Sequence, residues 1–209
     1  MLPRVALVVL LAVWTAPALA QAPPAIGQVE ALVGASTVAR FGASGATPLT
    51  LDAPVYEGDR IQTGAGARLA LAFVDGTVVQ LGESTDLVLD WFLYAPDADS
   101  QSALLRVSSG IFRVILEFVL PNAAFEVQTA TAAATVRGTD WITETAAGAT
   151  AIVALDGEVA VRNVDPGVAG QVVLGPGEGT DVAAGVAPSA PVVWGDARRN
   201  AFIERTTLP

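Results

Sequence analysis

The sequence predicts an all-β protein, built as a short β-solenoid or a coiled β-sandwich of many short strands. Most of the chain consists of short runs rich in Val, Ile, Leu, Thr and Ala, which Gly, Asp and Pro separate. Several runs alternate apolar and polar residues, as strands with one buried face do. Residues 28–184 contain no convincing amphipathic helical pattern, so we expect only a short helix, near 196–205.

The first 20 residues have the layout of a secretory signal peptide. Arg4 precedes an apolar run over 5–14, and small residues lead up to Ala20. The run is shorter than the roughly 20 residues of a spanning helix, and Pro17 interrupts it. We therefore expect cleavage near Ala20, a periplasmic or secreted protein, and no integral membrane segment after cleavage.

Beyond the leader we expect one domain with short extensions. A linker over 21–27 leads into a β domain over 28–184, and a Pro-containing tail over 185–209 includes the short helix. A β domain of this length can bury a substantial core without disulfides.

Two Asp-Gly pairs mark expected β-hairpins. The run 68–73 alternates, with its large apolar residues on one face, and Asp75-Gly76 leads it into 77–81. Asp156-Gly157 divides the run 150–163 in the same way, so we expect a second hairpin there.

The next strands follow from alternation and from one glycine hinge. Leu87, Leu89 and Trp91 share one face of a single run, so we expect Trp91 to pack in the core. An acidic loop over 95–102 follows; it lacks the glycine and the closing glutamate of a calcium loop, which indicates a plain exposed loop. Strands resume on both sides of Ser109-Gly110.

Composition excludes several kinds of chemistry. The 209 residues include no histidine and no cysteine, which rules out a Ser-His-Asp triad, a Cys-His pair and an ordinary zinc site. With 21 acids against 11 arginines and no lysine, the net charge is −10. An acidic surface repels phosphate backbones, so we expect no nucleic-acid partner. We expect no enzyme activity, no catalytic residue, no cofactor and no metal.

Acids and tryptophans keep a carbohydrate role open as an alternative. Three pairs of acids lie beside glycines in expected turns, where acids usually serve turn geometry: Glu57 with Asp59, Asp156 with Glu158, and Glu178 with Asp181. Trp141 and Trp194 would form a sugar-stacking platform only if they were exposed beside an acid.

The stretch TVRGTDW, residues 135–141, looks like a binding site but is better explained as a corner of the fold. We expect Arg137 to leave a strand, Gly138 to provide a turn or bulge, and Thr139 to begin the next strand. Arg137 would then pair with an acid or bind loop carbonyls. Contact of Arg137 and Asp140 with a ligand stays open.

These turns and strands, taken in order, resemble the FecR-type domain family over most of residues 28–184. The motifs that carry the resemblance include VYEGDRIQTGAGARLALAFVDGT (55–77), VSSGIFRV (107–114), TVRGTDWITE (135–144) and TAIVALDGEVAVRN (150–163). The resemblance implies a non-catalytic exported domain that binds an envelope protein in signalling or assembly. It marks these fold landmarks, for which partner contact is an open alternative: Gly58, Asp59, Thr63, Asp75, Gly76, Arg137, Gly138, Thr139, Asp156 and Gly157.

One departure limits what the resemblance implies. The ferric-citrate type of sensor has a cytoplasmic anti-sigma segment and a membrane helix ahead of its exported domain, whereas four residues precede the apolar run here. The resemblance therefore implies the fold and an exported binding context, and it does not extend to sigma-factor regulation.

Overall fold

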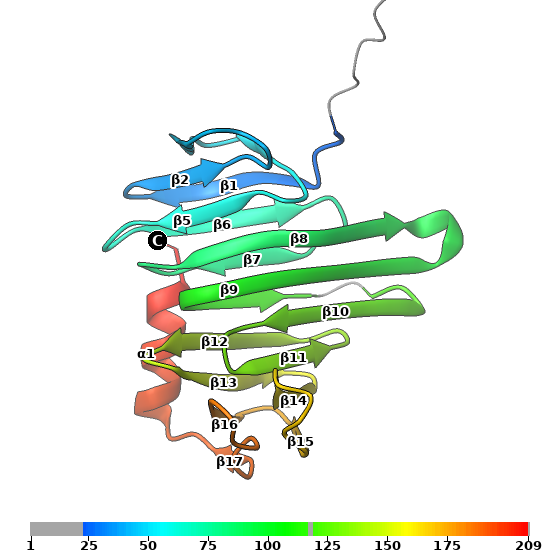
Figure 1. Ribbon diagram of the computed structural model, residues 1–209, viewed down its shortest axis with the longest axis vertical. Coiled ribbons are helices and arrows are strands. Elements are labelled where there is room, and N and C mark those ends of the chain that lie inside the picture. The colour runs from blue at the N-terminus through cyan, green and yellow to red at the C-terminus, as the bar shows by residue number, and fades with distance from the viewer. Residues whose placement is uncertain (1–22, 117–118, 209) are drawn as a thin grey trace, which may run out of the picture.

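The computed structural model describes residues 23–116 and 119–208, so the predicted signal peptide lies outside the described residues. Two hydrogen-bonded ladders of strands lie one in front of the other (Figure 1). Ladder A consists, in spatial order, of β4 (Pro54–Val55), β1 (Gly27–Val33), β6 (Arg68–Phe73), β7 (Val78–Leu81), one half of β9 (Ser100–Ile115), β12 (Asp140–Ala146), β13 (Ala149–Asp156), β16 (Glu178–Ala183) and β17 (Val192–Val193).

Ladder B takes the strands that lie between these in the sequence. Its order is β3 (Ala46–Pro48), β2 (Ser36–Ala39), β5 (Arg60–Thr63), β8 (Asp86–Ala95), the other half of β9, β10 (Asn122–Gln128), β11 (Ala132–Val136), β14 (Val159–Asn163) and β15 (Gln171–Leu174). The chain therefore passes repeatedly from one ladder to the other as it moves along the molecule.

Strand β9 joins the two ladders and bends at the predicted Ser109-Gly110 hinge. Residues 100–109 pair with β8, whereas residues 110–115 pair with β12. Gly110 has φ = +103°, and a Cβ there would lie 2.3 Å from the Cα atom of Thr85. Only glycine fits this close approach, so one strand serves both ladders.

The apolar faces of the two ladders share one core. Leu71 and Trp141 of ladder A and Leu105 and Val161 of ladder B belong to the same cluster of buried side chains. The predicted alternation of residues 68–73 is confirmed, because Leu69, Leu71 and Phe73 are all buried.

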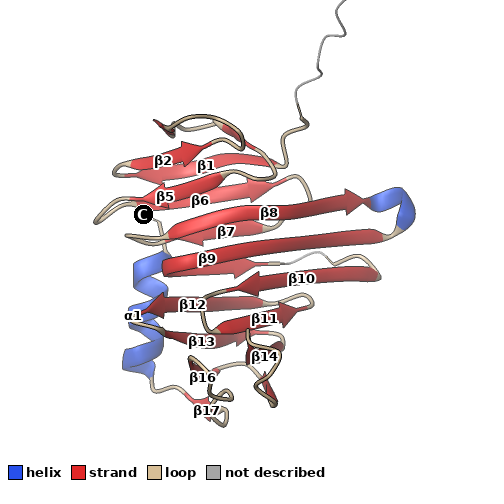
Figure 2. Ribbon diagram, viewed as in Figure 1, coloured by secondary structure: helices blue, strands red, loops and turns tan. Residues whose placement is uncertain are grey.

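Helix α1 (Asp196–Thr206) confirms the expected C-terminal helix and lies along one end of the strands (Figure 2). A second apolar cluster joins Phe202 of the helix and the preceding Trp194 to Ile111, Ile142 and Val153 from three strands of ladder A. The rings of Trp194 and Phe202 meet edge to face, 5.0 Å apart. One further short helical turn, η1 (Pro96–Ala98), lies in the predicted acidic loop.

The Asp75-Gly76 hairpin is confirmed, but the Asp156-Gly157 hairpin is wrong. Strands β6 and β7 pair antiparallel across the first turn. In contrast, β13 pairs with β12 and β16, while β14 pairs with β11 and β15. Both edges of β13 are therefore occupied, and Asp156-Gly157 carries the chain to ladder B. The crossing lets Ala154 and Val159 enter the core from opposite ladders.

The predicted core position of Trp91 is also wrong, since half of its surface is exposed. The register of β8 against β9 shifts between Leu89 and Trp91, which is a β-bulge. A bulge adds one residue and reverses which side chains face the core. Leu87 and Leu89 are buried as expected, whereas after the bulge Phe92 packs against the core instead.

The all-β class with one short C-terminal helix is thus confirmed. The choice between a solenoid and a sandwich, and the boundaries 28 and 184, stay predictions. Within residues 23–116 and 119–208, no helix is long and apolar enough to cross a membrane.

Candidate functional site

The landmarks Gly58 and Asp59 form a tight turn before β5. Gly58 has φ = +82°, which favours glycine. The Asp59 carboxylate is buried, pairs with the Arg40 guanidinium and accepts the N–H of Tyr56 at 2.8 Å. Its hydrogen bonds close its own turn, so Asp59 acts as a structural anchor.

Thr63 belongs to a buried network around the bend of β9. Its hydroxyl donates to the Gly82 carbonyl at 2.6 Å and accepts the N–H of Thr85 at 2.9 Å. The Thr85 hydroxyl lies 3.1 Å from the N–H of Ile111. These hydroxyls satisfy backbone groups where three strands meet.

Asp75 and Gly76 form the hairpin turn between β6 and β7, where Gly76 has φ = +86°. The buried Asp75 carboxylate accepts the N–H of Thr77 at 2.8 Å and the side-chain amide of Gln101, also at 2.8 Å. The Gln101 carbonyl then accepts the N–H of Leu120 at 3.2 Å. Asp75 therefore ties the hairpin to ladder B.

Arg137, Gly138 and Thr139 make the predicted corner between β11 and β12. The exposed Arg137 donates to the Pro121 carbonyl at 3.3 Å, which is the second of the two predicted roles. Gly138 has φ = +62°, as a turn glycine should. Thr139 is buried, and β12 begins one residue later than expected.

The structure brings the Asp156-Gly157 crossing against this corner. A Cβ on Gly157 would lie 2.5 Å from the Gly138 carbonyl oxygen, and the Thr139 hydroxyl donates to the Glu158 carbonyl at 3.2 Å. The ten landmarks thus do not converge on one site. Arg137, Gly138 and Thr139 meet Asp156-Gly157 at this corner, whereas the other five lie at the Gly58 turn, on β5 and at the Gly76 turn. Their contact with a partner stays a prediction.

The acids of two predicted pairs, Glu57 with Asp59 and Glu178 with Asp181, have structural partners. Glu57 accepts the N–H of Phe92 at 3.2 Å, and Glu178 accepts a backbone N–H of its own turn at 2.8 Å. Asp181 forms an ion pair with Arg198 at 2.7 Å. Each of these acids has a local structural partner, as expected for acids at turns.

A hollow of about 340 Å³ has Asp140 and Asp156 on its wall. Both Asp140 oxygens bind the guanidinium of Arg113, at 2.8 and 2.5 Å. This hydrogen bond raises the pKa of Arg113 above its ordinary value. Asp140 is therefore engaged by an arginine, and the hollow offers no acid–base pair.

The tryptophans do not form the predicted sugar platform. Trp141 lies in the main core and Trp194 lies under helix α1, and both are buried. The exposed indole is that of Trp91, which we had assigned to the core. The carbohydrate alternative has no support from these residues.

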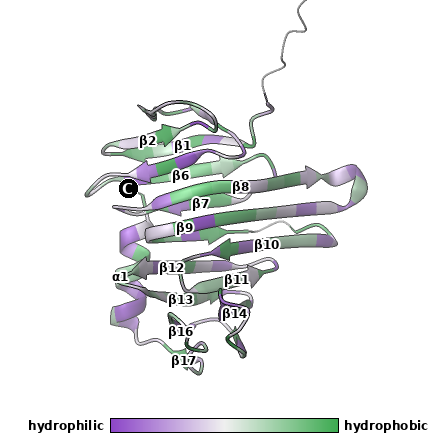
Figure 3. Ribbon diagram, in the orientation of Figure 1, coloured by the Kyte–Doolittle hydropathy of each residue, from purple (hydrophilic) through white to green (hydrophobic). Residues whose placement is uncertain are grey.

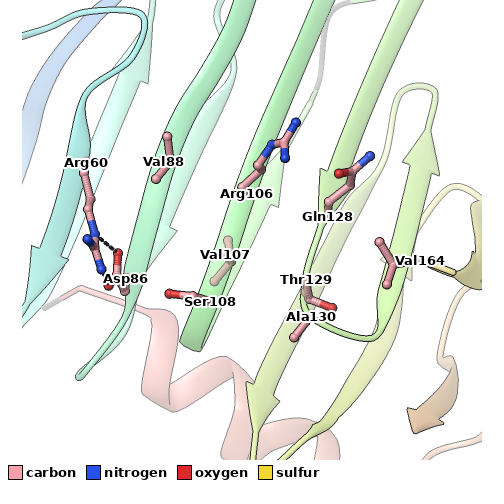
Figure 4. Close-up of a pocket in the computed structure, with 10 residues that line it drawn as sticks. All are labelled: Arg60, Asp86, Val88, Arg106, Val107, Ser108, Gln128, Thr129, Ala130 and Val164. Carbon is pink, nitrogen blue, oxygen red and sulfur yellow. Dashed lines mark hydrogen bonds and ion pairs between the residues drawn. The ribbon is translucent and has the colours of Figure 1, made fainter. Parts of the chain in front are cut away.

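The outer face of ladder B carries an open groove of about 490 Å³ (Figure 4). Arg60 donates to Asp86 at 2.8 Å, and this hydrogen bond holds the pKa of the Asp86 carboxyl below its ordinary value. Arg106 beside it pairs with Asp90 at 2.9 Å, and Gln128 lies on the next strand. Both arginines of the groove are ion-paired, and valine and alanine side chains form much of its wall, so the groove carries little unpaired positive charge.

An exposed apolar surface also lies on the long β8–β9 hairpin, which projects beyond its neighbours (Figure 1). Trp91 and Leu93 are 50% and 38% exposed, and the Trp91 indole donates to the Ser102 hydroxyl at 3.1 Å. The end of the hairpin is hydrophilic (Figure 3). Phe41, 88% exposed, packs over Gly58 at the adjacent turn.

We define Trp91, Leu93 and the backbone of residues 92–94 as the β8 edge. The sequence reasoning missed it. The signal was the run WFLY over 91–94, in which apolar residues occupy both faces and so break the alternation. Among the described residues, no group of three or more Asp or Glu side chains could hold a metal ion.

Taken together, the two ladders, the turn glycines and the exposed hairpin define an all-β domain. The family model described as FecR protein matches residues 59–160. The chain therefore contains a FecR domain, as its motifs predicted.

Solved structures share this fold. Two crystal structures of a "putative anti-sigma factor" from Parabacteroides distasonis are 18% identical to the chain, with TM-scores of 0.54 and 0.55. Each similarity covers 69% of this chain and 64% or 63% of the other. The chain thus spans less than two thirds of those proteins, and at this identity the likeness concerns the fold alone. No curated protein matches the sequence.

Proposed function

We propose that this protein is an exported, non-catalytic FecR-type module that binds a protein partner in envelope signalling or assembly. The observation that carries the proposal is the FecR match over residues 59–160. The β8 edge supports it, because exposed aromatic and aliphatic side chains beside an open strand are typical of protein-binding surfaces.

Export rests on the sequence of the leader. Arg4, the apolar run and the small residues before Ala20 form a signal-peptide pattern. The absence of cysteine fits a periplasm better than a disulfide-rich extracellular setting. The mature protein begins near Gln21 in this proposal.

A binding role also fits the chemistry of the site. The carboxylates of Asp59, Glu57, Asp140 and Glu178 are each engaged by an arginine or a backbone N–H group. The Parabacteroides distasonis structures carry the description "putative anti-sigma factor", a kind of regulatory protein. We extend a regulatory role to this chain and assign it no sigma factor.

The test is capture of the partner in the cell of origin. The full chain carries a C-terminal tag, and reversible crosslinking is followed by purification and mass spectrometry. We expect a mature N-terminus near Gln21 and one envelope protein enriched over a control in which an unrelated exported β protein carries the same tag. An intact leader would refute export. Specific binding would be refuted if the tagged chain and the control recovered every envelope protein in equal amounts.

A further inference from the structure

Among the described residues, no strand pairs with the second half of β8 along the edge opposite β9. Strand β5 pairs with β8 at residues 86–88, and Leu89 then exchanges backbone hydrogen bonds with Gly58 and Asp59 at 2.6 and 2.9 Å. From residue 91 to 95, β9 is the only strand that pairs with β8 within the described part of the chain. The projecting half of β8 is therefore an open sheet edge.

The backbone of this edge is oriented for pairing. The N–H of Phe92 donates to the Glu57 carboxylate at 3.2 Å, so it faces away from β9. In an antiparallel strand, the hydrogen-bonding direction alternates from residue to residue. The N–H and carbonyl of Tyr94 therefore face the same open side. Glu57 occupies the position that a carbonyl of an added strand would take.

Side chains next to this backbone provide an apolar contact. Trp91 and Leu93 lie on the outer face, on either side of Phe92 in the sequence. The hydrogen bond from the indole to Ser102 fixes the ring, so little side-chain entropy is lost when a partner covers it. Added strands gain affinity from main-chain hydrogen bonds and specificity from such alternate side chains.

Charge indicates what kind of strand fits. Glu57, Asp97 and Asp99 surround the projecting hairpin, and none forms an ion pair within residues 23–116 and 119–208. Arg106 is already paired with Asp90. The surroundings of the edge are therefore negative, which favours a cationic partner and disfavours a second copy bearing the same acids.

We propose that the β8 edge docks an extended, cationic segment of the partner protein, which joins ladder B as an additional strand. The inference rests on the proposed function and names the surface and the chemistry of the partner. The bound segment displaces Glu57 from Phe92, pairs with Phe92 and Tyr94, and places apolar side chains on Trp91 and Leu93.

The test uses the purified full chain and a labelled decapeptide of alternating Val and Thr with Lys at both ends. Anisotropy measures binding, and amide hydrogen exchange measures protection at Phe92 and Tyr94. We expect exchange at Tyr94 to slow by about tenfold or more at saturation, since a hydrogen-bonded amide must open to exchange. A peptide with Glu in place of Lys should bind about tenfold more weakly.

Two lysine variants separate the edge from general charge effects. Leu93→Lys places a cation on the edge and should weaken the Lys-ended peptide about tenfold. Val173→Lys adds the same charge on β15, where the side chain is similarly exposed, and should leave the affinity within about twofold. If Leu93→Lys does not fold, Glu57→Gln provides the second variant, because it removes charge and keeps an acceptor for Phe92.

Several outcomes overturn the proposal: equal effects of the two lysine variants, equal binding of the Glu-ended peptide, or unprotected amides at Phe92 and Tyr94. Protection that appears without peptide as protein concentration rises would assign the edge to a second copy.

If the tagged protein captures its partner equally well with Leu93→Lys, the docking edge is wrong while the proposed function stands. If peptide binding succeeds but no partner is captured, the function fails and the edge stands.

Discussion

Replacing Gly110 with alanine tests whether the bend of β9 depends on a close approach of two strands. A Cβ at this position would lie 2.3 Å from both the Cα and the Oγ1 atoms of Thr85. Rotation of the Thr85 side chain cannot relieve this contact, because the Cα atom of Thr85 belongs to the backbone and does not move with the side chain. The backbone of β9 or of the segment before β8 must therefore move.

The expected cost has two parts. Alanine in a left-handed conformation costs about 1–2 kcal/mol, because Gly110 has φ = +103°. Forcing an extra carbon into a packed site costs about 1–3 kcal/mol more. We therefore expect Gly110→Ala to lower the free energy of unfolding by about 2–5 kcal/mol.

Gly76→Ala provides the matched control. Gly76 also has a left-handed backbone, with φ = +86°, but a Cβ there would meet no atom within 4 Å. Its expected cost is the backbone part alone, about 1–2 kcal/mol. The difference between the two variants isolates the steric part.

Urea unfolding followed by tryptophan fluorescence gives both free energies, since Trp141 is buried in the core. If Gly110→Ala were no more destabilising than Gly76→Ala, the strands would not be held as close as the structure shows. The role assigned to the hinge would then be wrong.

Three further changes test other parts of the fold. Gly138→Val should lower the melting temperature clearly, because it places a β-branched residue at φ = +62° with a Cβ 3.1 Å from Val119; an unchanged melt would exclude the turn. Asp75→Ala should cost about 1–3 kcal/mol in urea unfolding, since it leaves the buried Gln101 amide unpaired, and a neutral result would contradict that network. The lowered pKa of Asp86 means that its pairing with Arg60 stabilises the fold above pH 4, roughly the unfolded pKa, and that this contribution is lost as acid protonates the carboxyl. Asp86→Asn should therefore reduce the fall in melting temperature between about pH 4 and pH 2, and an identical pH profile would refute it.

The parts of the fold that depend on neighbours in the sequence were predictable. Alternation alone assigned the buried face of β6, with Leu69 and Leu71, because strand geometry fixes which side chains share a face. The turn at Gly76 and the hinge at Gly110 were equally local. The short alternating runs predicted the all-β class, and the FecR motifs, which combine several such local features in order, implied the same fold.

The errors concern choices that depend on distant strands. Asp156-Gly157 suits a hairpin locally, but β12 and β16 occupy both edges of β13 and send the chain to the other ladder. Trp91 has the right phase for the core until the bulge reverses it. The β8 edge was hidden for the same reason, since an open edge is defined by where β5 stops pairing.

Helix α1 also has a consequence for the order in which the chain can fold. It holds ladder A through contacts with residues much earlier in the sequence, including the ion pair of Arg205 with Glu144 at 2.6 Å. A chain that emerges N-terminus first presents Ile111, Ile142 and Val153 long before Phe202 can cover them. Closing such distant contacts is slow, because the entropy of the intervening loop is lost first. Trp194 and Phe202 thus complete this cluster only after all three strands have been synthesised, and until then the strands expose an apolar face.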